Sequence, residues 1–206
     1  MKEDTQNIIE SLLPEVKEHR KIGIFGGSFN PPHLGHAMMV LTVLMTQDID
    51  EVWILPTASH AEKEGLMPFG DRMEMCKHTF GHIQGVKVIP MESFMPSPNY
   101  TLNTVKTLKT LRPEIDLYFM IGSDLVEEVP HWTRSEGLTD FCTFLIVPRQ
   151  GHPLVELPEE LGTPVEVDLS ISLPEVSSTL IGKLKKRGAS VKGFLEKRVN
   201  DLLEQL

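Results

Sequence analysis

The sequence is poor in cysteine, in long apolar runs and in positive charge, and each shortage excludes a class of protein. Cys76 and Cys142 are the two cysteines among 206 residues. A disulfide framework would need more of them, and these two do not form a close metal-binding pair. Cys142 falls in the apolar run 141–147, so we expect it to be a small core residue.

No apolar stretch is long enough to cross a membrane. The most apolar stretches, such as 38–45, are far shorter than the ~20 residues that span a bilayer. The opening residues, M-K-E-D-T-Q-N-I-I-E, are too polar to resemble a signal peptide. These features predict a cytoplasmic protein without a membrane partner.

Positive charge is in deficit, with 20 Lys and Arg against 29 Asp and Glu and a net charge of -9. An acidic surface repels the nucleic-acid backbone, so we expect no nucleic-acid partner. Small phosphorylated substrates remain possible, because they need only a local cationic pocket.

The chain is most simply one domain, residues 21–206, preceded by an N-terminal helical extension at 1–20. Within 5–19 the apolar residues have helical spacing, but Pro14 interrupts them, which predicts a short or kinked helix packed on the surface. No internal repeat, low-complexity tract or interdomain linker follows.

From residue 21 onward, strand-like and helix-like segments alternate. The expected strands are 21–26, 51–56, 86–90, 116–122, 142–148 and 164–169, and the expected helices are 36–46, 71–80, 102–111, 177–187 and 193–205. This alternation predicts an α/β protein with a Rossmann-like, doubly wound parallel sheet of five to six strands. Ligands of such sheets bind at the carboxyl ends of strands, here after residues 26, 56, 90 and 122 and around 170–180.

The first of these turns carries most of the chemistry. Gly26 and Gly27 let the backbone approach a ligand closely, and a diproline stiffens the loop after Asn30. His33 and His36 then stand three residues apart at the start of a helix, so both imidazoles can face one site. A helix N-terminus suits a phosphate chain because it presents free N–H groups and partial positive charge.

The sequence of this turn does not match three other kinds of binding site. It lacks the G-x-G-x-x-G of a dinucleotide site, which disfavours a redox dehydrogenase, and the G-K-[ST] of a Walker loop. A zinc site would need a third ligand of suitable spacing, and none stands nearby.

The segment G-G-S-F-N-P-P-H-L-G-H at 26–36 resembles the signature of the HxGH nucleotidyltransferases. Within them it is most similar to the bacterial nicotinate-nucleotide adenylyltransferases, and the resemblance covers nearly all of residues 21–206. It implies the Rossmann-like fold of that family. It also implies an ATP site built from this loop, the turn I-G-S-D at 121–124 and V-S-S-T-L-I-G at 176–182. The implied ATP-binding residues are Gly26, Gly27, Ser28, Phe29, His33, His36, Gly122, Asp124, Ser177, Ser178 and Thr179.

The same resemblance implies a site for a phosphorylated acceptor. Its segments are P-F-G-D-R-M-E-M at 68–75, S-P-N-Y-T-L-N-T at 97–104 and H-W-T-R at 131–134. The implied acceptor-binding residues are Asn30, Lys63, Arg72, Tyr100, Thr101 and Trp132. Two plainer interpretations stay open: Arg72 as a surface salt bridge, and Trp132 as a half-buried loop aromatic. Trp53, inside the second expected strand, is expected in the core.

One departure from the family concerns Gly182. The family has there an arginine that contacts the ATP phosphates, whereas glycine supplies no charge. Lys183, Lys185, Lys186 and Arg187 follow, and one of them could substitute, although a lysine lacks the bidentate fork of arginine.

The reaction that this resemblance implies is transfer of AMP from ATP to nicotinate mononucleotide, releasing pyrophosphate. His36, His33 and Lys63 are the expected catalytic residues, and Mg²⁺ is expected to be held by substrate and water rather than by a protein metal site. Nicotinamide mononucleotide or another small phosphate is an alternative acceptor. A nucleotide-binding regulatory module with weak turnover is an alternative function, because of Gly182. A monomer and a homo-oligomer are both compatible with this function.

Overall fold

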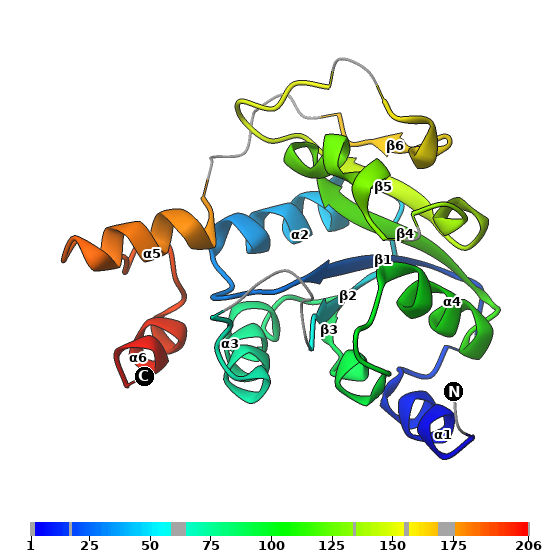
Figure 1. The fold of residues 1–206 in the computed structure, drawn as a ribbon, viewed down its shortest axis with the longest axis horizontal. Helices are drawn as coiled ribbons and strands as arrows, with labels where there is room; N and C mark the ends of the chain where they lie inside the picture. The colour runs from blue at the N-terminus through cyan, green and yellow to red at the C-terminus, as the bar shows by residue number, and fades with distance from the viewer. Residues whose placement is uncertain are drawn as a thin grey trace.

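A computed structural model describes residues 3–16, 18–58, 65–133, 135–154, 157–168 and 176–205. Its centre is a six-stranded parallel sheet in the order β3-β2-β1-β4-β5-β6 (Figure 1). The strands are β1 (Arg20–Gly27), β2 (Glu51–Pro56), β3 (Val86–Val88), β4 (Ile115–Gly122), β5 (Thr143–Val147) and β6 (Val165–Glu166). The predicted Rossmann-like parallel sheet is confirmed, with six strands.

The strand order reverses between β1 and β4. The chain first builds outward from β1 to β3 and then crosses back to place β4 on the other side of β1. In parallel sheets of this kind the loops on the two sides of the reversal diverge and leave a crevice for ligands. The register also pairs Gly27, the last residue of β1, with Pro56, the last residue of β2, so the loops after both strands begin side by side.

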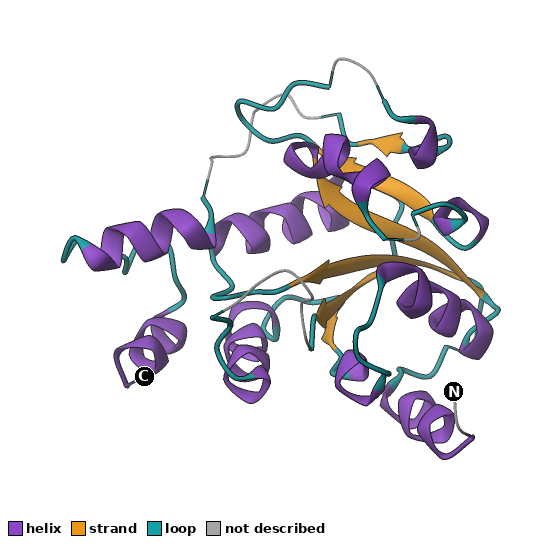
Figure 2. Ribbon diagram, viewed as in Figure 1, coloured by secondary structure: helices purple, strands orange, loops and turns teal. Residues whose placement is uncertain are grey.

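Helices cover both faces of the sheet (Figure 2). The helices are α1 (Glu3–Leu12), α2 (Leu34–Thr46), α3 (Phe69–Phe80), α4 (Thr101–Leu111), α5 (Ser178–Lys186) and α6 (Lys197–Gln205). Short 3₁₀ helices are η1 (Met91–Phe94), η2 (Ser123–His131), η3 (Leu138–Asp140) and η4 (Glu159–Leu161). One core layer contains α1, α4 and the 3₁₀ helices, and the other contains α2 and α3.

The strands read as continuous apolar runs because both of their faces are covered. Ile22, Ile24 and Trp53 pack in one layer, while Val52, Ile54 and Leu145 pack in the other, and all six are fully buried. The core positions expected for Trp53 and Cys142 are confirmed, at 0% and 7% exposure.

The predicted elements differ from the observed ones mainly at their ends. The last helix begins at Lys197 rather than 193. Strand β6 covers Val165–Glu166, shorter than the expected 164–169, of which 169 lies outside the described residues. The 3₁₀ helix η2 was not anticipated.

Helix α1 ends at Leu12, two residues before Pro14, which confirms the predicted short helix. It lies deeper than a surface extension, because Ile9 is 0% and Leu13 6% exposed within the larger core layer. Arg112 fixes the end of α1 by donating to the carbonyls of Glu10, Leu13 and Pro14, and it pairs with the Glu10 carboxylate at 3.5 Å.

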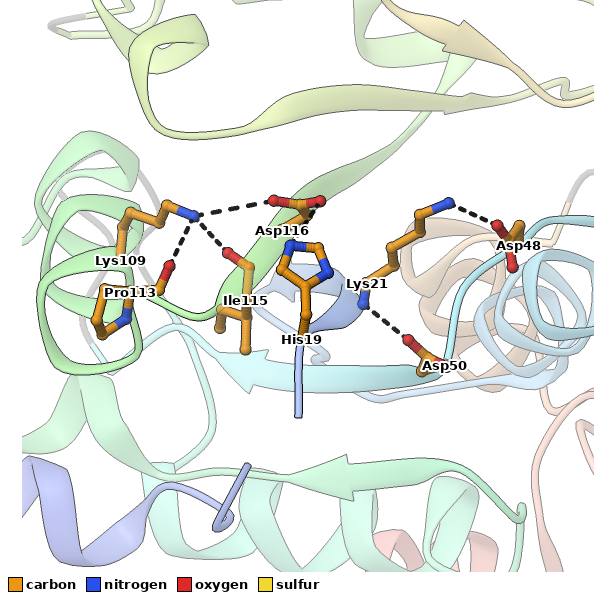
Figure 3. Close-up of polar contacts among 8 residues, drawn as sticks. All are labelled: His19, Lys21, Asp48, Asp50, Lys109, Pro113, Ile115 and Asp116. Carbon is orange, nitrogen blue, oxygen red and sulfur yellow. Dashed lines mark hydrogen bonds and ion pairs between the residues drawn. The ribbon is translucent and has the colours of Figure 1, made fainter. Parts of the chain in front are cut away.

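Polar contacts join the chain segments at the amino-terminal edge of the sheet (Figure 3). His19 and Lys109 both reach Asp116, at 3.2 and 4.0 Å. Lys21 pairs with Asp48 through its side chain and donates to Asp50 through its backbone N–H. These groups are exposed or half-buried, so each pair contributes little stability. They fix the entry into β1, at the edge opposite to the predicted ligand sites.

Helices α5 and α6 form a separate small unit with α3. Val176, Ile181 and Val199 make a cluster of their own with Met75 of α3. Figure 1 shows α5 and α6 on the same side of the sheet as α2 and α3, with the start of α5 meeting the start of α2. The N-termini of α2 and α5 therefore converge beyond the carboxyl end of β1.

In the described part of the chain, no helix is long and apolar enough to span a membrane.

Candidate active site

The loop between β1 and α2 is held by a buried aromatic residue. Phe29 has a φ of 43° and an exposure of 2%, which are unusual together for a bulky residue. Its ring packs edge-on against Phe25, Phe80 and the imidazole of His36. The sequence placed Phe29 among the ATP-binding residues; the structure places its side chain beneath His36, where it supports that ring.

His33 and His36 lie together as the sequence predicted. Their rings stack at a centroid distance of 3.6 Å, and His33 is the N-cap residue of α2. The backbone N–H of His33 donates to Nδ1 of His36 at 3.2 Å. Nδ1 is therefore an acceptor, and the proton of the neutral His36 ring is on Nε2.

Both histidines are held in the neutral form. Burial lowers the pKa of His33 to about 4, and the positive charge of Arg149 adds to the effect. Burial also lowers the pKa of His36 well below its usual value, with further contributions from His33 and Arg149. At neutral pH the pair offers N–H donors without carrying charge.

Arg149 supplies the positive charge beside the histidines. It lies two residues after the end of β5 and contacts two other segments of the chain. Its guanidinium donates from NH1 to the Oδ2 of Asp124 at 3.0 Å, and from NH2 to the carbonyl of Val176 at 2.9 Å. Its backbone N–H donates to the Oγ of Ser123 at 2.9 Å. This residue ties the ends of β4 and β5 to the segment that enters α5.

The turn after β4 is shaped around Asp124 and Arg149. At Gly122 a Cβ would fall on Asp124 Oδ1 and on Cδ of Arg149, so a larger residue would displace both side chains. Asp124 Oδ1 is buried and has no hydrogen-bond partner among the described residues. The prediction that Gly122 and Asp124 stand at the strand end is confirmed, and this oxygen is left as an acceptor.

The start of α5 is docked against the first loop. Ser177 is the N-cap of α5 and accepts from the backbone N–H of Leu180 at 3.2 Å. Ser178 Oγ donates to the carbonyl of Pro31 at 2.9 Å. At Gly35 a Cβ would lie 3.0 Å from the Val176 carbonyl oxygen, so glycine permits the two helix starts to approach. The predicted proximity of 177–179 to the histidine loop is thereby explained, and Thr179 is exposed in the first turn of α5.

On the acceptor side, Arg72 is completely enclosed. It is 1% exposed and donates to the carbonyls of Ser28, Thr57, Ala58 and Met67. The alternative of a surface salt bridge is therefore wrong. Asn30 makes a parallel contact, since its Oδ1 accepts from the Met67 backbone N–H at 3.0 Å. Both residues stabilise the loops that border the acceptor side, and their direct contact with an acceptor stays a prediction.

The remaining acceptor-side residues are spread along this edge. Tyr100 is the N-cap of α4 and Thr101 its first residue, both half-buried. Trp132 is half-buried and packs on the core with its ring edge-on to Phe119 at 6.1 Å, and its stacking on an acceptor ring stays a prediction. Lys63 lies outside the described residues.

Among the described residues, no group of three or more His, Cys, Asp or Glu side chains is arranged to hold a metal. The positive charge beside the histidines belongs to the Arg149 guanidinium, which suits phosphate oxygens.

Comparison with known proteins agrees with this geometry. Residues 24–184 match the family model described as cytidylyltransferase-like. A probable nicotinate-nucleotide adenylyltransferase of Bacillus licheniformis is 39% identical over 171 residues, covering 82% of this chain and 87% of the relative. One from Anaeromyxobacter dehalogenans is 34% identical over 189 residues, covering 90% and 95%. The chain belongs to the nicotinate-nucleotide adenylyltransferase family.

A solved structure with low sequence identity has the same fold. The Plasmodium falciparum nicotinic acid mononucleotide adenylyltransferase, complexed with APC, superposes with a TM-score of 0.76 at 21% identity. It covers 91% of this chain and 96% of the other. At that identity the likeness supports the fold alone.

Within this adenylyltransferase framework, Gly182 lies on an open part of α5. A Cβ built there meets nothing within 4 Å. Of the basic residues that follow, Lys183, Lys186 and Arg187 are exposed, and Lys185 donates to the Leu203 carbonyl of α6 at 3.0 Å. The positive charge that acts on both histidines is that of Arg149.

Sequence reasoning missed two residues of this region, Arg149 and Glu92. Arg149 directly follows a predicted strand, so the rule that ligands bind at carboxyl ends could have found it. Glu92 accepts from Thr104 Oγ at 3.0 Å and from the backbone N–H of Ala58, and burial raises its pKa. Arg72 and Glu92 thus hold residue 58 through its carbonyl and its N–H, and no sequence pattern indicated that pairing.

Proposed function

We propose that this protein transfers the adenylyl group of ATP to nicotinate mononucleotide, giving nicotinate adenine dinucleotide and pyrophosphate. The observation that carries the proposal is the geometry of His36, whose Nδ1 accepts from the His33 backbone N–H, so that Nε2 carries the proton of a ring packed against Phe25 and Phe29. It stands where two helix N-termini and Arg149 converge, which is an environment for a phosphate chain.

In this reaction an oxygen of the acceptor 5′-phosphate attacks the α-phosphorus of ATP in line. The bond from that phosphorus to the oxygen bridging to the β-phosphorus breaks, and pyrophosphate leaves with the electron pair. The acceptor phosphate is already ionised, so no protein nucleophile or general base is needed. The protein contributes position and charge stabilisation.

His36 donates from Nε2 to a non-bridging oxygen of the α-phosphate, where negative charge increases in the transition state. A neutral donor held at a fixed angle does this without the cost of first burying a charged ring. His33 binds the phosphate chain beside it. The partial positive charges at the starts of α2 and α5, together with Arg149, attract the β- and γ-phosphates.

ATP enters this site as its Mg²⁺ complex, in which phosphate oxygens and water hold the ion. The ion neutralises part of the triphosphate charge. Ser177, Ser178 and Thr179 present the start of α5 to the β- and γ-phosphates, and Asp124 Oδ1 accepts from a hydroxyl of the nucleotide.

The acceptor occupies the side bordered by the loops after β2 and before α4. Lys63 neutralises phosphate charge there, and Trp132 stacks on the pyridine ring, with Tyr100 and Thr101 at the mouth. Arg72 and Asn30 act on the acceptor through the loops that they hold. A cytoplasmic location belongs to the same proposal, and light scattering will establish whether a homo-oligomer forms.

The direct test incubates the full chain with ATP, Mg²⁺ and either nicotinate or nicotinamide mononucleotide while pyrophosphate is measured. The proposal expects release with the nicotinate form. Faster release with the nicotinamide form would show that nicotinamide mononucleotide is the preferred acceptor. ATP binding without pyrophosphate from any acceptor would support a regulatory module instead.

The mechanism is tested with His36→Ala, which should reduce pyrophosphate release by about 100–1000-fold, the effect of losing one preorganised donor. His82→Ala, at an exposed histidine, is the matched control and should leave turnover unchanged. Near-normal turnover of the His36 variant would reject this role.

A further inference from the structure

Arg149 joins three parts of the molecule that the chain itself separates. Its backbone binds Ser123 after β4, its NH1 binds Asp124, and its NH2 binds the Val176 carbonyl before α5. The pair is mostly enclosed, with 16% of the Arg149 and 26% of the Asp124 side chain exposed. An ion pair of this kind has a defined geometry, unlike the mobile pairs of a protein surface.

Val176 is one of the residues through which the start of α5 contacts the histidine loop. Its carbonyl faces Gly35 and its side chain belongs to the cluster of α5 and α6. The next residue, Ser177, caps α5, and the residue after it donates to Pro31 in the histidine loop. A shift of Val176 would therefore move the start of α5 relative to His33 and His36.

We propose that Arg149 is a positioning residue that fixes the start of α5 over the His33–His36 pair and supplies there the positive charge that Gly182 lacks. This inference rests on the proposed function, because it concerns how the same site holds ATP. Arginine is required because its planar fork serves a carboxylate and a carbonyl at once, which a lysine ammonium cannot do with the same geometry. Gly122 leaves the room that the Arg149 stem occupies.

The charge has a second consequence, for the protonation of the histidines. His36 is faced by His33 from its own helix, by Arg149 from the end of β5, and by Asp124 behind that guanidinium. Among the described residues, its ring also packs against Phe25 of β1 and Phe29 of the following loop, with Phe80 of α3 behind Phe29. Removing the Arg149 charge therefore makes both histidines easier to protonate.

The test compares Arg149→Met, Arg149→Lys and Arg112→Met in the full chain. Arg149→Met should raise the KM for ATP about tenfold, the effect of one charge-assisted hydrogen bond, and leave the KM for nicotinate mononucleotide within about twofold. It should also shift the acid limb of kcat/KM to higher pH. Arg149→Lys keeps the positive charge but loses the planar guanidinium with its two donor nitrogens. It should therefore raise the KM for ATP and leave the acid limb of the kcat/KM pH profile unchanged.

Arg112 is the matched control. It also pairs with a carboxylate and donates to remote carbonyls, with 12% of its side chain exposed, but it fixes α1 at the opposite end of the molecule. Arg112→Met should lower stability without changing the KM for ATP or the acid limb. The inference is overturned if Arg149→Met behaves like Arg112→Met, or if both substrates lose affinity equally.

Two further outcomes remain decisive. If Arg149→Met does not fold, Arg149→Lys decides: an unchanged KM for ATP would overturn the inference. If the wild-type chain releases no pyrophosphate with any acceptor, the proposed function fails by itself. Calorimetric titration with a non-hydrolysable ATP analogue then still tests Arg149, with a Kd about tenfold higher expected for Arg149→Met.

Discussion

The backbone N–H of His33 donates to Nδ1 of His36 across 3.2 Å, while the two rings stack at 3.6 Å. The first residue of the pair thus fixes which nitrogen of the second can donate to a ligand. The geometry follows from the i, i+3 spacing at the start of α2, where the N-cap N–H lies within reach of a side chain one turn later.

This relationship predicts that two polar replacements of His36 behave differently. Glutamine places an amide near the position of Nε2, whereas asparagine places one near Nδ1. His36→Gln should therefore keep more pyrophosphate release than His36→Asn, and His36→Asn should resemble the alanine variant. Steady-state kinetics measures the order, and equal rates for the two amides would show that Nε2 is not the donor that matters.

The low pKa of His33 predicts a loss of stability in acid. Between pH 4 and 6.5 the unfolded chain binds a proton at residue 33 that the folded protein does not, so stability decreases as the pH falls through this window. The full effect is about 3 kcal/mol for a pKa that moves from 6.5 to about 4. Urea unfolding at pH 4.5 and 7 should show a smaller difference for His33→Asn than for the wild type.

His82→Asn, at an exposed position, is the control for that experiment and should keep the wild-type difference between the two pH values. If His33→Asn keeps the whole wild-type difference as well, the ring of His33 is not the source.

Gly182→Arg should improve the enzyme. The position is open, so the side chain enters without a clash, and replacing a helical glycine removes a penalty of up to ~1 kcal/mol. The new guanidinium lies where the family carries its phosphate-binding arginine, so the KM for ATP should fall. Gly182→Ala separates the two effects: it should raise the melting temperature and leave the KM for ATP unchanged.

Substitutions of Ile8 and Ile9 measure how much the packing of α1 contributes to the stability of the core. Ile9 is 0% exposed in the main core layer and Ile8 is 44% exposed. Ile9→Ala should lower the free energy of unfolding by about 2–5 kcal/mol, and Ile8→Ala should change it by less than about 0.5 kcal/mol. Chemical denaturation measures both, and equal small effects would mean that α1 is a dispensable surface extension.

The sequence predicted what depends on neighbouring residues. Apolar runs punctuated by turn residues give the strands and helices, because their periodicity reflects which faces are covered. His33 and His36 could be paired from their spacing alone. Element ends were less accurate, as in α6, which begins at Lys197 rather than at 193.

Side chains of long or ambiguous reach could not be placed in this way. Arg72 looked like a group that projects toward a ligand or solvent, but it is enclosed by four carbonyls from loops that only the sheet register brings together. Trp132 lies on the core through Phe119, a contact across two elements that no local pattern reveals.

The sequence by itself determined the loop from Gly26 to His36, its place after the first strand and the helix that begins beside it, because these are local properties of a short segment. Only the tertiary structure decided that Arg149 stands against Asp124 and Val176, that the starts of α2 and α5 converge, and that His36 is neutral with its proton on Nε2. Those features depend on burial and on the reversal of strand order at β1 and β4. That reversal brings together residues far apart in the chain, and it is set by the packing of the whole domain.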